Sequence, residues 1–262
     1  MSRYQQLIEE IFLRNYEKGA TVVAFDRDEL VDCAKALKMK LPKNLGDVIY
    51  SFRYRNPLPE SVVATATEER EWIIGGAGRG RYEFRQVKIN RIVPSEQLIA
   101  IKIPDATPEI VLAHALSDEQ ALLAKVRYNR LIDVFLGVAA YSLQNHLRTT
   151  AKGVGQIEID EIYVAIDRHG RQFVLPVQAK GGTDQLGVVQ TAQDIACCEE
   201  KYPNLICRAI STQFIDNDLI AMFELAIQDD FVKVVQEKHY KLVPGADISD
   251  KDLKLYNKTA VD

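Results

Sequence analysis

Residues 156–166, Gln-Ile-Glu-Ile-Asp-Glu-Ile-Tyr-Val-Ala-Ile, and residues 172–180, Gln-Phe-Val-Leu-Pro-Val-Gln-Ala-Lys, decide the fold of this chain. Both runs are rich in β-branched and aromatic residues, and His169-Gly170 between them is a turn signal, so they are predicted to form two neighbouring antiparallel strands. Residues 184–201 then show a helical pattern that Pro203 ends, and two further apolar runs, 205–214 and 219–226, are predicted as strands. This order predicts an α/β fold with a mixed sheet and helices on its faces.

Polar side chains interrupt the two apolar runs at matching places. Successive strand residues point to opposite faces, so Glu158 and Asp160 share one face of the first strand and Gln178 and Lys180 share one face of the second. Carboxylate and amide oxygens are ligands that Mg²⁺ accepts, which predicts a cation site there. The alternative is a structural salt bridge between Asp160 and Lys180, because short motifs of this kind often match by chance. Pro176 lacks a donor for the sheet ladder and predicts that the second strand lies at an edge or is bulged.

The order Asp160, then Gln178-Ala179-Lys180 at the end of a second strand, then a helix, resembles the PD-(D/E)XK nuclease superfamily with its restriction-endonuclease-like fold. The Gln-x-Lys form resembles its Mrr-like branch, and the resemblance covers about residues 117–226. It implies hydrolysis of DNA to 5′-phosphate products. It also implies that Asp160, Gln178 and the main-chain carbonyl of Ala179 hold Mg²⁺, with Mn²⁺ as a substitute, and that Lys180 orients or activates the attacking water.

One departure from the family pattern concerns charge. Gln178 stands where the family usually has an acidic residue, which makes the predicted site less negative. Glu161 or Glu158 could supply the missing charge, and at most one of them does, because neighbouring strand residues lie on opposite faces; Glu161 is counted with the catalytic candidates. Some relatives use a glutamate on the preceding helix, and the nearest polar residues here are Asn129 and Asp133, neither of which is assigned a role.

The first third of the chain is predicted as a separate small domain. Helices are expected at about 4–16, 30–37 and 44–54, a strand at 21–25 and a hairpin between about 72 and 87. Two helices followed by a hairpin resemble a winged helix-turn-helix module, an α+β domain whose second helix would enter the major groove. Prolines punctuate residues 92–109, so the predicted boundaries are 1–110 for the DNA-recognition domain and 111–262 for the nuclease domain. Residues 117–149 are predicted to be mainly helical.

Charge is distributed unevenly along the chain. The 33 basic and 37 acidic residues leave a net charge of −4, which does not suit a non-specific nucleic-acid binder. Residues 38–55 and 70–91 are nevertheless basic, and the segment Gly76-Ala-Gly-Arg-Gly80 is predicted to be a hairpin tip rather than a phosphate cradle, because no helix follows it. The predicted DNA-binding residues are Lys43, Arg53, Arg55, Arg79 and Arg81, together with Gln190 on the helix after the predicted site.

Several classes of protein are disfavoured by what the sequence contains. None of the cysteines, Cys33, Cys197, Cys198 and Cys207, forms a Cys-x-x-Cys pair, and the histidines are scattered without ligand spacing, which argues against structural zinc. No segment carries a nucleophile signature for acyl transfer. No stretch approaches the roughly 20 apolar residues that cross a bilayer, and the start lacks a secretory signal, so a cytoplasmic protein without membrane contact is expected.

These observations predict a magnesium-dependent DNA endonuclease of the restriction or defence type. A homodimer is expected, because cutting both strands of a duplex requires two sites in opposite polarity. The alternative is a DNA-binding regulator that carries an inactive nuclease-like domain, since Gln178 removes a negative ligand. RNA or branched DNA as substrate, the recognition sequence and any dependence on base modification stay open at this level.

Overall fold

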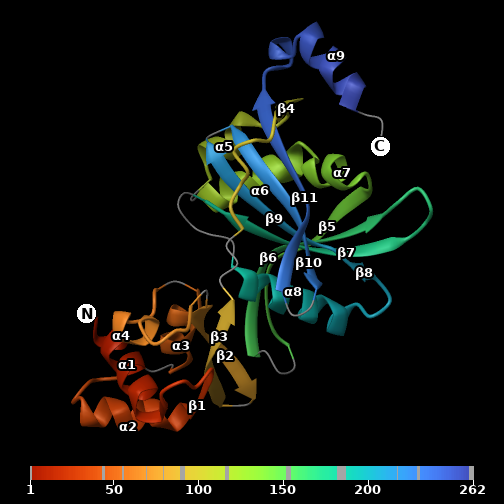
Figure 1. Ribbon diagram of the computed structural model, residues 1–262. Helices are drawn as coiled ribbons and strands as arrows, with labels where there is room; N and C mark the ends of the chain where they lie inside the picture. The colour runs from red at the N-terminus through yellow and green to blue at the C-terminus, as the bar shows by residue number, and fades with distance from the viewer. Residues whose placement is uncertain are drawn as a thin grey trace. The chain divides into compact units, whose positions relative to one another are not determined.

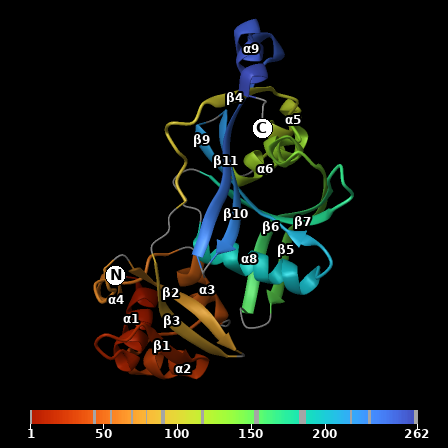
Figure 2. The same cartoon turned by 45° about the vertical axis from the view of Figure 1, so that its right-hand side comes forward.

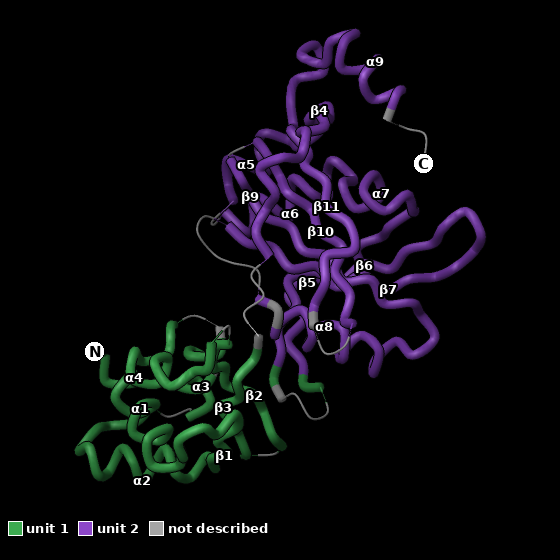
Figure 3. Tube along the Cα trace, in the orientation of Figure 1, with its two compact units in different colours: residues 1–89, 150–156 green, residues 90–149, 157–262 purple. Residues whose placement is uncertain are grey.

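A computed structural model describes residues 2–42, 45–54, 56–68, 70–78, 80–88, 92–115, 118–151, 155–181, 187–216, 218–228 and 231–259. The chain divides into two compact units (Figure 3). Unit 1 comprises residues 1–89 and 150–156, and unit 2 comprises residues 90–149 and 157–262. Residues 90–110 therefore group with unit 2, whereas the boundary expected from the sequence assigned them to the first domain.

Unit 1 is a small α+β body built around a three-stranded antiparallel sheet in the order β1-β3-β2. The hairpin expected near residues 72–87 is present, with Ile74 paired to Phe84. Its elements, in chain order, are α1 (Arg3–Asn15), β1 (Val22–Asp26), α2 (Arg27–Ala36), α3 (Gly46–Tyr54), α4 (Glu60–Val63), β2 (Arg70–Gly78) and β3 (Arg81–Lys88).

Local signals in the sequence explain these boundaries. Ser2 and Gln5 form a capping box at the start of α1, and Asp26 and Glu29 do the same for α2, so backbone donors at both helix starts are satisfied. The apolar faces of the helices pack on the sheet, where the Phe12 ring lies 5.1 Å from both Trp72 and Phe84 in edge-on contacts. Such aromatic pairs add to the stabilisation that burial of their area provides.

Unit 2 contains a large mixed sheet whose main path is β4-β11-β10-β9-β7-β6-β5, with β8 paired to β7 outside that path (Figure 1). β7 is parallel to β9 and antiparallel to β6, so it lies inside the sheet. The strands and helices, in chain order, are β4 (Ala100–Pro104), α5 (Glu109–Ala113), α6 (Asp118–Tyr128), α7 (Leu131–Leu136), β5 (Ala139–Ala151), β6 (Gly155–Ile166), β7 (Gln172–Lys180), α8 (Val188–Lys201), β8 (Ile206–Cys207), β9 (Ala209–Asp216), β10 (Leu219–Gln228), β11 (Phe231–Val243), η1 (Gly245–Asp247) and α9 (Asp250–Thr259).

Helices cover the two faces of this sheet (Figures 1 and 2). On one face, α6 and α7 bury apolar side chains such as Leu122 and Phe135 against Tyr163 of β6 and Leu175 of β7. On the other face, Ile195 of α8 packs in a second cluster with Phe223 of β10. The mixed α/β architecture predicted from the sequence is thus present.

Two expectations about unit 2 were wrong. The region predicted as mainly helical up to residue 149 is interrupted by Gly137, which ends α7 in a left-handed conformation (φ 65°), and residues 139–151 form the strand β5. β7 is neither an edge strand nor bulged at Pro176. That proline lies opposite the interruption between β8 and β9, where the backbone amide of Arg208 bonds to Val174, so a missing ladder donor costs little.

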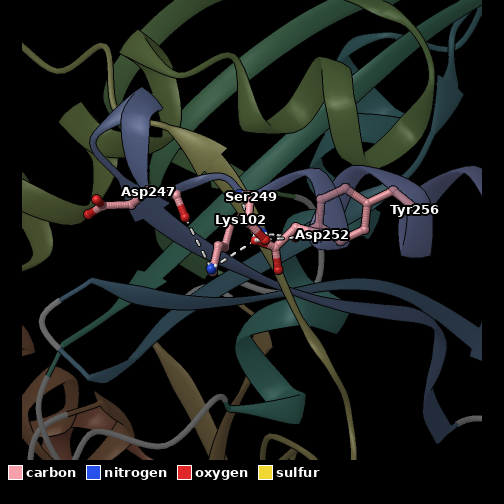
Figure 4. Close-up of polar contacts among 5 residues, drawn as sticks. All are labelled: Lys102, Asp247, Ser249, Asp252 and Tyr256. Carbon is pink, nitrogen blue, oxygen red and sulfur yellow. Dashed lines mark hydrogen bonds and ion pairs between the residues drawn. The ribbon is translucent and has the colours of Figure 1, made fainter.

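The edge strand β4 is covered by the C-terminal segment (Figure 4). The backbone N–H of Lys102 donates to the Tyr256 hydroxyl at 2.9 Å, and the Lys102 ammonium donates to the Asp252 carboxylate at 3.0 Å and to the Asp247 carbonyl at 3.2 Å. Ser249 and Asp252 exchange side-chain and backbone hydrogen bonds in a capping box that starts α9. Covering an edge in this way removes a template for unwanted strand pairing.

Within the described ranges, no helix is long and apolar enough to cross a membrane.

Candidate functional site between strand β6 and the end of strand β7

The predicted site residue Asp160 lies immediately beyond the paired part of β6. The β6–β7 register runs from Ile166 paired with Gln172 to Glu161 paired with Val177. In the next position the Asp160 Oδ2 atom accepts a hydrogen bond from the backbone N–H of Ala179 at 2.9 Å. The carboxylate of β6 is therefore tied directly to the Gln178-Ala179-Lys180 segment.

Lys180 lies close enough to Asp160 for their charges to interact. Burial raises the pKa of Asp160, while the Ala179 hydrogen bond and the positive charge of Lys180 oppose that increase. Lys180 makes no direct ion pair with this carboxylate within 4.0 Å in the described part of the chain. The salt bridge considered as an alternative is thus not formed, and the two groups remain separate neighbours.

Gln178 is buried and its amide is held from both sides. Its Nε2 donates to the Asp194 Oδ2 at 2.7 Å and to the Glu158 carbonyl at 3.2 Å. Its Oε1 accepts from Gln190 Nε2 at 2.9 Å. Because the two partners of Nε2 are both acceptors, the orientation of the amide is fixed by its contacts.

Asp194 on α8 joins the group from the helix side. This carboxyl is only 2% exposed, and burial raises its pKa well above the usual value. The negative charge of Asp160 raises the pKa further, whereas the Gln178 hydrogen bond and the Lys180 charge lower it. Asp194 and Gln190 are one helical turn apart on α8 and therefore both reach Gln178.

The start of α6 approaches the same end of β7. A Cβ atom placed on Gly181 would lie 2.8 Å from the Asp118 side chain and 3.6 Å from the Glu119 backbone nitrogen, so only glycine allows this close passage. The charge of Glu119 raises the pKa of Asp160, and that of His146 on β5 lowers it. Glu119 is therefore a further acidic neighbour of the site.

Glu161, the accessory acid expected from the sequence, lies on the other face of β6. It is fully buried beneath Arg127 of α6, whose guanidinium reaches its Oε1 at 2.9 Å, and Ser142 Oγ donates to the same oxygen at 2.6 Å. The structure thus places it apart from Asp160. Glu158, the other candidate, pairs with the exposed side chain of Arg148 at 3.2 Å.

The remaining predicted residues are spread over both units. Arg81 begins β3 and is largely exposed, with Asp26 at 3.6 Å, and Arg53 is partly buried in α3. Lys43, Arg55 and Arg79 lie outside the described residues. Gln190 does not point away from the site but contacts Gln178.

Sequence reasoning missed Glu119 and Asp194. The two polar residues considered on the helical region before the site have other roles: Asn129 bonds to Asp105 and Thr107, and Asp133 pairs with Arg130. A local signal for Asp194 exists, because it is a charged residue on the side of α8 that also carries Ile195 and Thr191, both buried. Its partner could not be read from the sequence.

The oxygen atoms gathered here suit a hard divalent cation. They comprise the Asp160 carboxylate, the Gln178 Oε1 atom and, by position, the Ala179 carbonyl. No three His, Cys, Asp or Glu side chains converge as a metal-holding cluster in the ranges that the structure describes. Mg²⁺ is commonly bound by one or two carboxylates with several waters and substrate phosphates, and the donor set fits that mode.

The chain matches no family model, no curated protein and no solved structure.

Proposed function

We propose that this protein is a magnesium-dependent DNA endonuclease of the restriction or defence type that hydrolyses phosphodiester bonds to leave 5′-phosphates. The observation that carries this proposal is the tie between Asp160 and the Gln178-Ala179-Lys180 segment, through the Ala179 N–H, with Lys180 close enough to lower the Asp160 pKa. A carboxylate in β6 is thus tied to the end of β7, the segment that also carries an amide side chain and a lysine. The resemblance of this motif to PD-(D/E)XK nucleases and their restriction-endonuclease-like fold supports the same reading.

In this mechanism each residue has a separate task. Asp160 provides an anionic oxygen toward the cation, and its bond to the Ala179 N–H fixes the direction of that oxygen. Lys180, which is not paired with Asp160, is available to hold the scissile phosphate or the attacking water. A bound Mg²⁺ would lower the pKa of a water and neutralise charge on the phosphate. Gln178 is fixed by Asp194 and Gln190, which limits its movement.

Unit 1 would bring the DNA to this site. Its element order is helix, strand, three helices and then a two-stranded hairpin, and the helices followed by a hairpin support the winged-helix-like module proposed from the sequence. In such a module α3 would enter the major groove, and the exposed Arg81 at the tip of the β2–β3 hairpin, where it pairs with Gly78, would contact the phosphate backbone. Two copies of the chain would be needed to cut both strands, so a homodimer on DNA is part of the proposal.

Plasmid cleavage tests the proposal. The wild-type chain should cut supercoiled DNA with Mg²⁺ or Mn²⁺, and Asp160→Ala and Lys180→Ala should each lower the rate by about 100-fold or more, because both act on the reacting phosphate. Lys233→Ala is the matched control, since Lys233 is exposed in the same unit and bonds only locally to Gln228. Unchanged cutting by the Asp160 and Lys180 variants would rule out this active site.

A second candidate is a DNA-binding regulator whose unit 2 is inactive. The observation in its favour is that both ends of the Gln178 amide already have partners. In that case the wild-type chain would shift a DNA duplex in a gel without cleaving it at any Mg²⁺ or Mn²⁺ concentration.

A further inference from the structure

The two carboxylate oxygens of Asp194 differ in their hydrogen bonding. Its Oδ2 atom accepts from Gln178 Nε2 at 2.7 Å, but Oδ1 is buried and has no hydrogen-bond partner among the described residues. Leaving a buried polar atom unpaired costs about 1–3 kcal/mol, and more when the group is charged. Such a group calls for an explanation, and a bound ion or water is one that suits a carboxylate oxygen.

The contacts of Gln178 explain why the acidic group is not on β7. Two acceptors, the Asp194 carboxylate and the Glu158 carbonyl, face its Nε2 atom. A carboxylate at position 178 would set oxygen against oxygen at both contacts, which is unfavourable in a buried setting. The amide on β7 and the carboxylate on α8 therefore require each other.

Asp160 and Asp194 are each tied to the Gln178-Ala179 segment. Asp160 is bonded to the backbone of Ala179, the residue next to Gln178, and Asp194 is bonded to the Gln178 side chain. The charge of Asp160 acts on Asp194, and the charge of Lys180 acts on both carboxylates. Two carboxylates from different elements thus face one small polar region at the end of β7.

We propose that Asp194 supplies the second negative charge of the divalent-cation site, in place of an acidic residue at position 178. This inference rests on the proposed function, because it concerns the same cation. The charge has moved from the strand to the helix α8, where its unpartnered Oδ1 is free to interact with a hard cation or with one of its waters. Gln178 then keeps a ligand oxygen without adding charge.

A single isosteric substitution separates the role of this charge from a purely structural role. Asp194→Asn retains a side-chain oxygen that can accept from Gln178 Nε2, so the amide stays in place, but it removes the negative charge. If Asp194 only positions Gln178, cation binding should not change. If its charge serves the cation, binding should weaken.

The experiment is a Mn²⁺ titration of the full chain without DNA, followed by the electron paramagnetic resonance signal of free Mn²⁺ at one pH. We expect Asp194→Asn to weaken Mn²⁺ binding by about 10-fold or more, as loss of a supporting carboxylate does in other metal sites. The double variant Gln178→Glu and Asp194→Asn returns a charge to the site and should recover part of that loss. This double variant also decides the matter if the single variant folds poorly.

Two reference variants make the outcomes distinct. Asp133→Asn removes the same charge from a mostly buried carboxyl paired with Arg130 away from the site, and it should bind Mn²⁺ like the wild type. If Asp160→Asn weakens binding while Asp194→Asn does not, the role of Asp194 is overturned and the proposed function stands. A wild-type chain that binds no Mn²⁺, or an Asp160→Asn variant that binds it equally well, would overturn both.

Discussion

Asp160 and Glu161 are neighbours in β6, and their carboxylates lie on opposite faces of the strand with different contacts. Glu161 is fully buried, and a guanidinium and a hydroxyl converge on its Oε1 atom, while its Oε2 atom has no hydrogen-bond partner among the described residues. Asp160, one residue earlier, accepts a backbone hydrogen bond, while Lys180 and His146 act on it without forming an ion pair among the described residues. Burial of a charge is tolerated when a partner compensates it, so Glu161 is a structural group. Asp160 is held in position without full compensation, which is typical of groups that act on something else.

The position of each residue along β6 decides which contacts its carboxylate makes. Glu161 is the first residue of β6, in chain order, that pairs with β7, and its side chain points to the α6 face. Asp160 stands just past that pairing, at the end where β7 runs out to Gly181. The lesson is that neighbouring acidic residues in a strand are not interchangeable, and sequence spacing alone cannot rank them.

Arg127→Ala should give the largest effect on stability. It leaves the fully buried Glu161 carboxylate without its cation, and because the Arg127 side chain is 39% exposed, the loss should be about 2–3 kcal/mol, below that of a fully buried pair. Urea unfolding followed by circular dichroism would measure it. An unfolding free energy within about 1 kcal/mol of the wild type would show that Glu161 is not the structural carboxylate of the pair.

Ser142→Ala tests the second contact of Glu161 with a smaller change. Its hydroxyl donates to a charged and buried acceptor at 2.6 Å, so its loss should lower the unfolding free energy by about 1–2 kcal/mol. The same urea experiment applies, with Ser142→Thr as a control that retains the hydroxyl. Equal losses in both variants would indicate a packing effect and not a lost hydrogen bond.

Asp160→Asn should act in the opposite direction. Because burial raises the pKa of Asp160 above 3.8, the ionised carboxyl destabilises the fold, and stability falls as the pH rises from about 4 through the raised pKa. The asparagine variant lacks this loss, so at neutral pH its unfolding free energy should be higher than that of the wild type, while near pH 3 the two proteins should agree. Thermal unfolding between pH 3 and 8 checks this, and a variant less stable than wild type at pH 7 would contradict it.

Asp252→Asn should give the smallest effect, far from both faces of β6. Hydrogen bonds from Ser249, followed by Lys102, lower the pKa of Asp252 to about 2. The ionised form thus supports the docking of α9 above pH 3.8, and that support is lost as the pH falls toward 2. Trypsin should cleave after Lys251 and Lys254 faster in the variant than in the wild type at pH 7.

The sequence was sufficient for the elements whose side chains are sorted by burial. β6, β7 and α8 have strong apolar patterns and clear turn signals, so they were predicted close to their observed bounds. β5 was not, because most of its side chains are exposed and the few apolar ones, such as Leu143, happen to continue the helical spacing of α7. β11 was missed for a related reason, since it mixes exposed Val234 and Val235 with polar residues.

The candidate site was predictable only in part. Asp160, Gln178 and Lys180 follow from strand alternation, a local property. Glu119 lies on helix α6 and Asp194 on helix α8. The placement of these helices against the sheet depends on packing between residues far apart in the sequence. Glu161 was expected in the site because the sequence does not reveal that Arg127 would lie over it.

The hydrogen bond to the Tyr256 hydroxyl makes the backbone amide of Lys102 a probe of whether α9 is docked. The Lys102 amide on the outer side of β4 is bonded to that hydroxyl and not to another strand. Its proton should therefore exchange slowly with deuterated solvent only while α9 is docked. The exchange rate of this one amide would follow the attachment of α9 in any variant or complex of the protein.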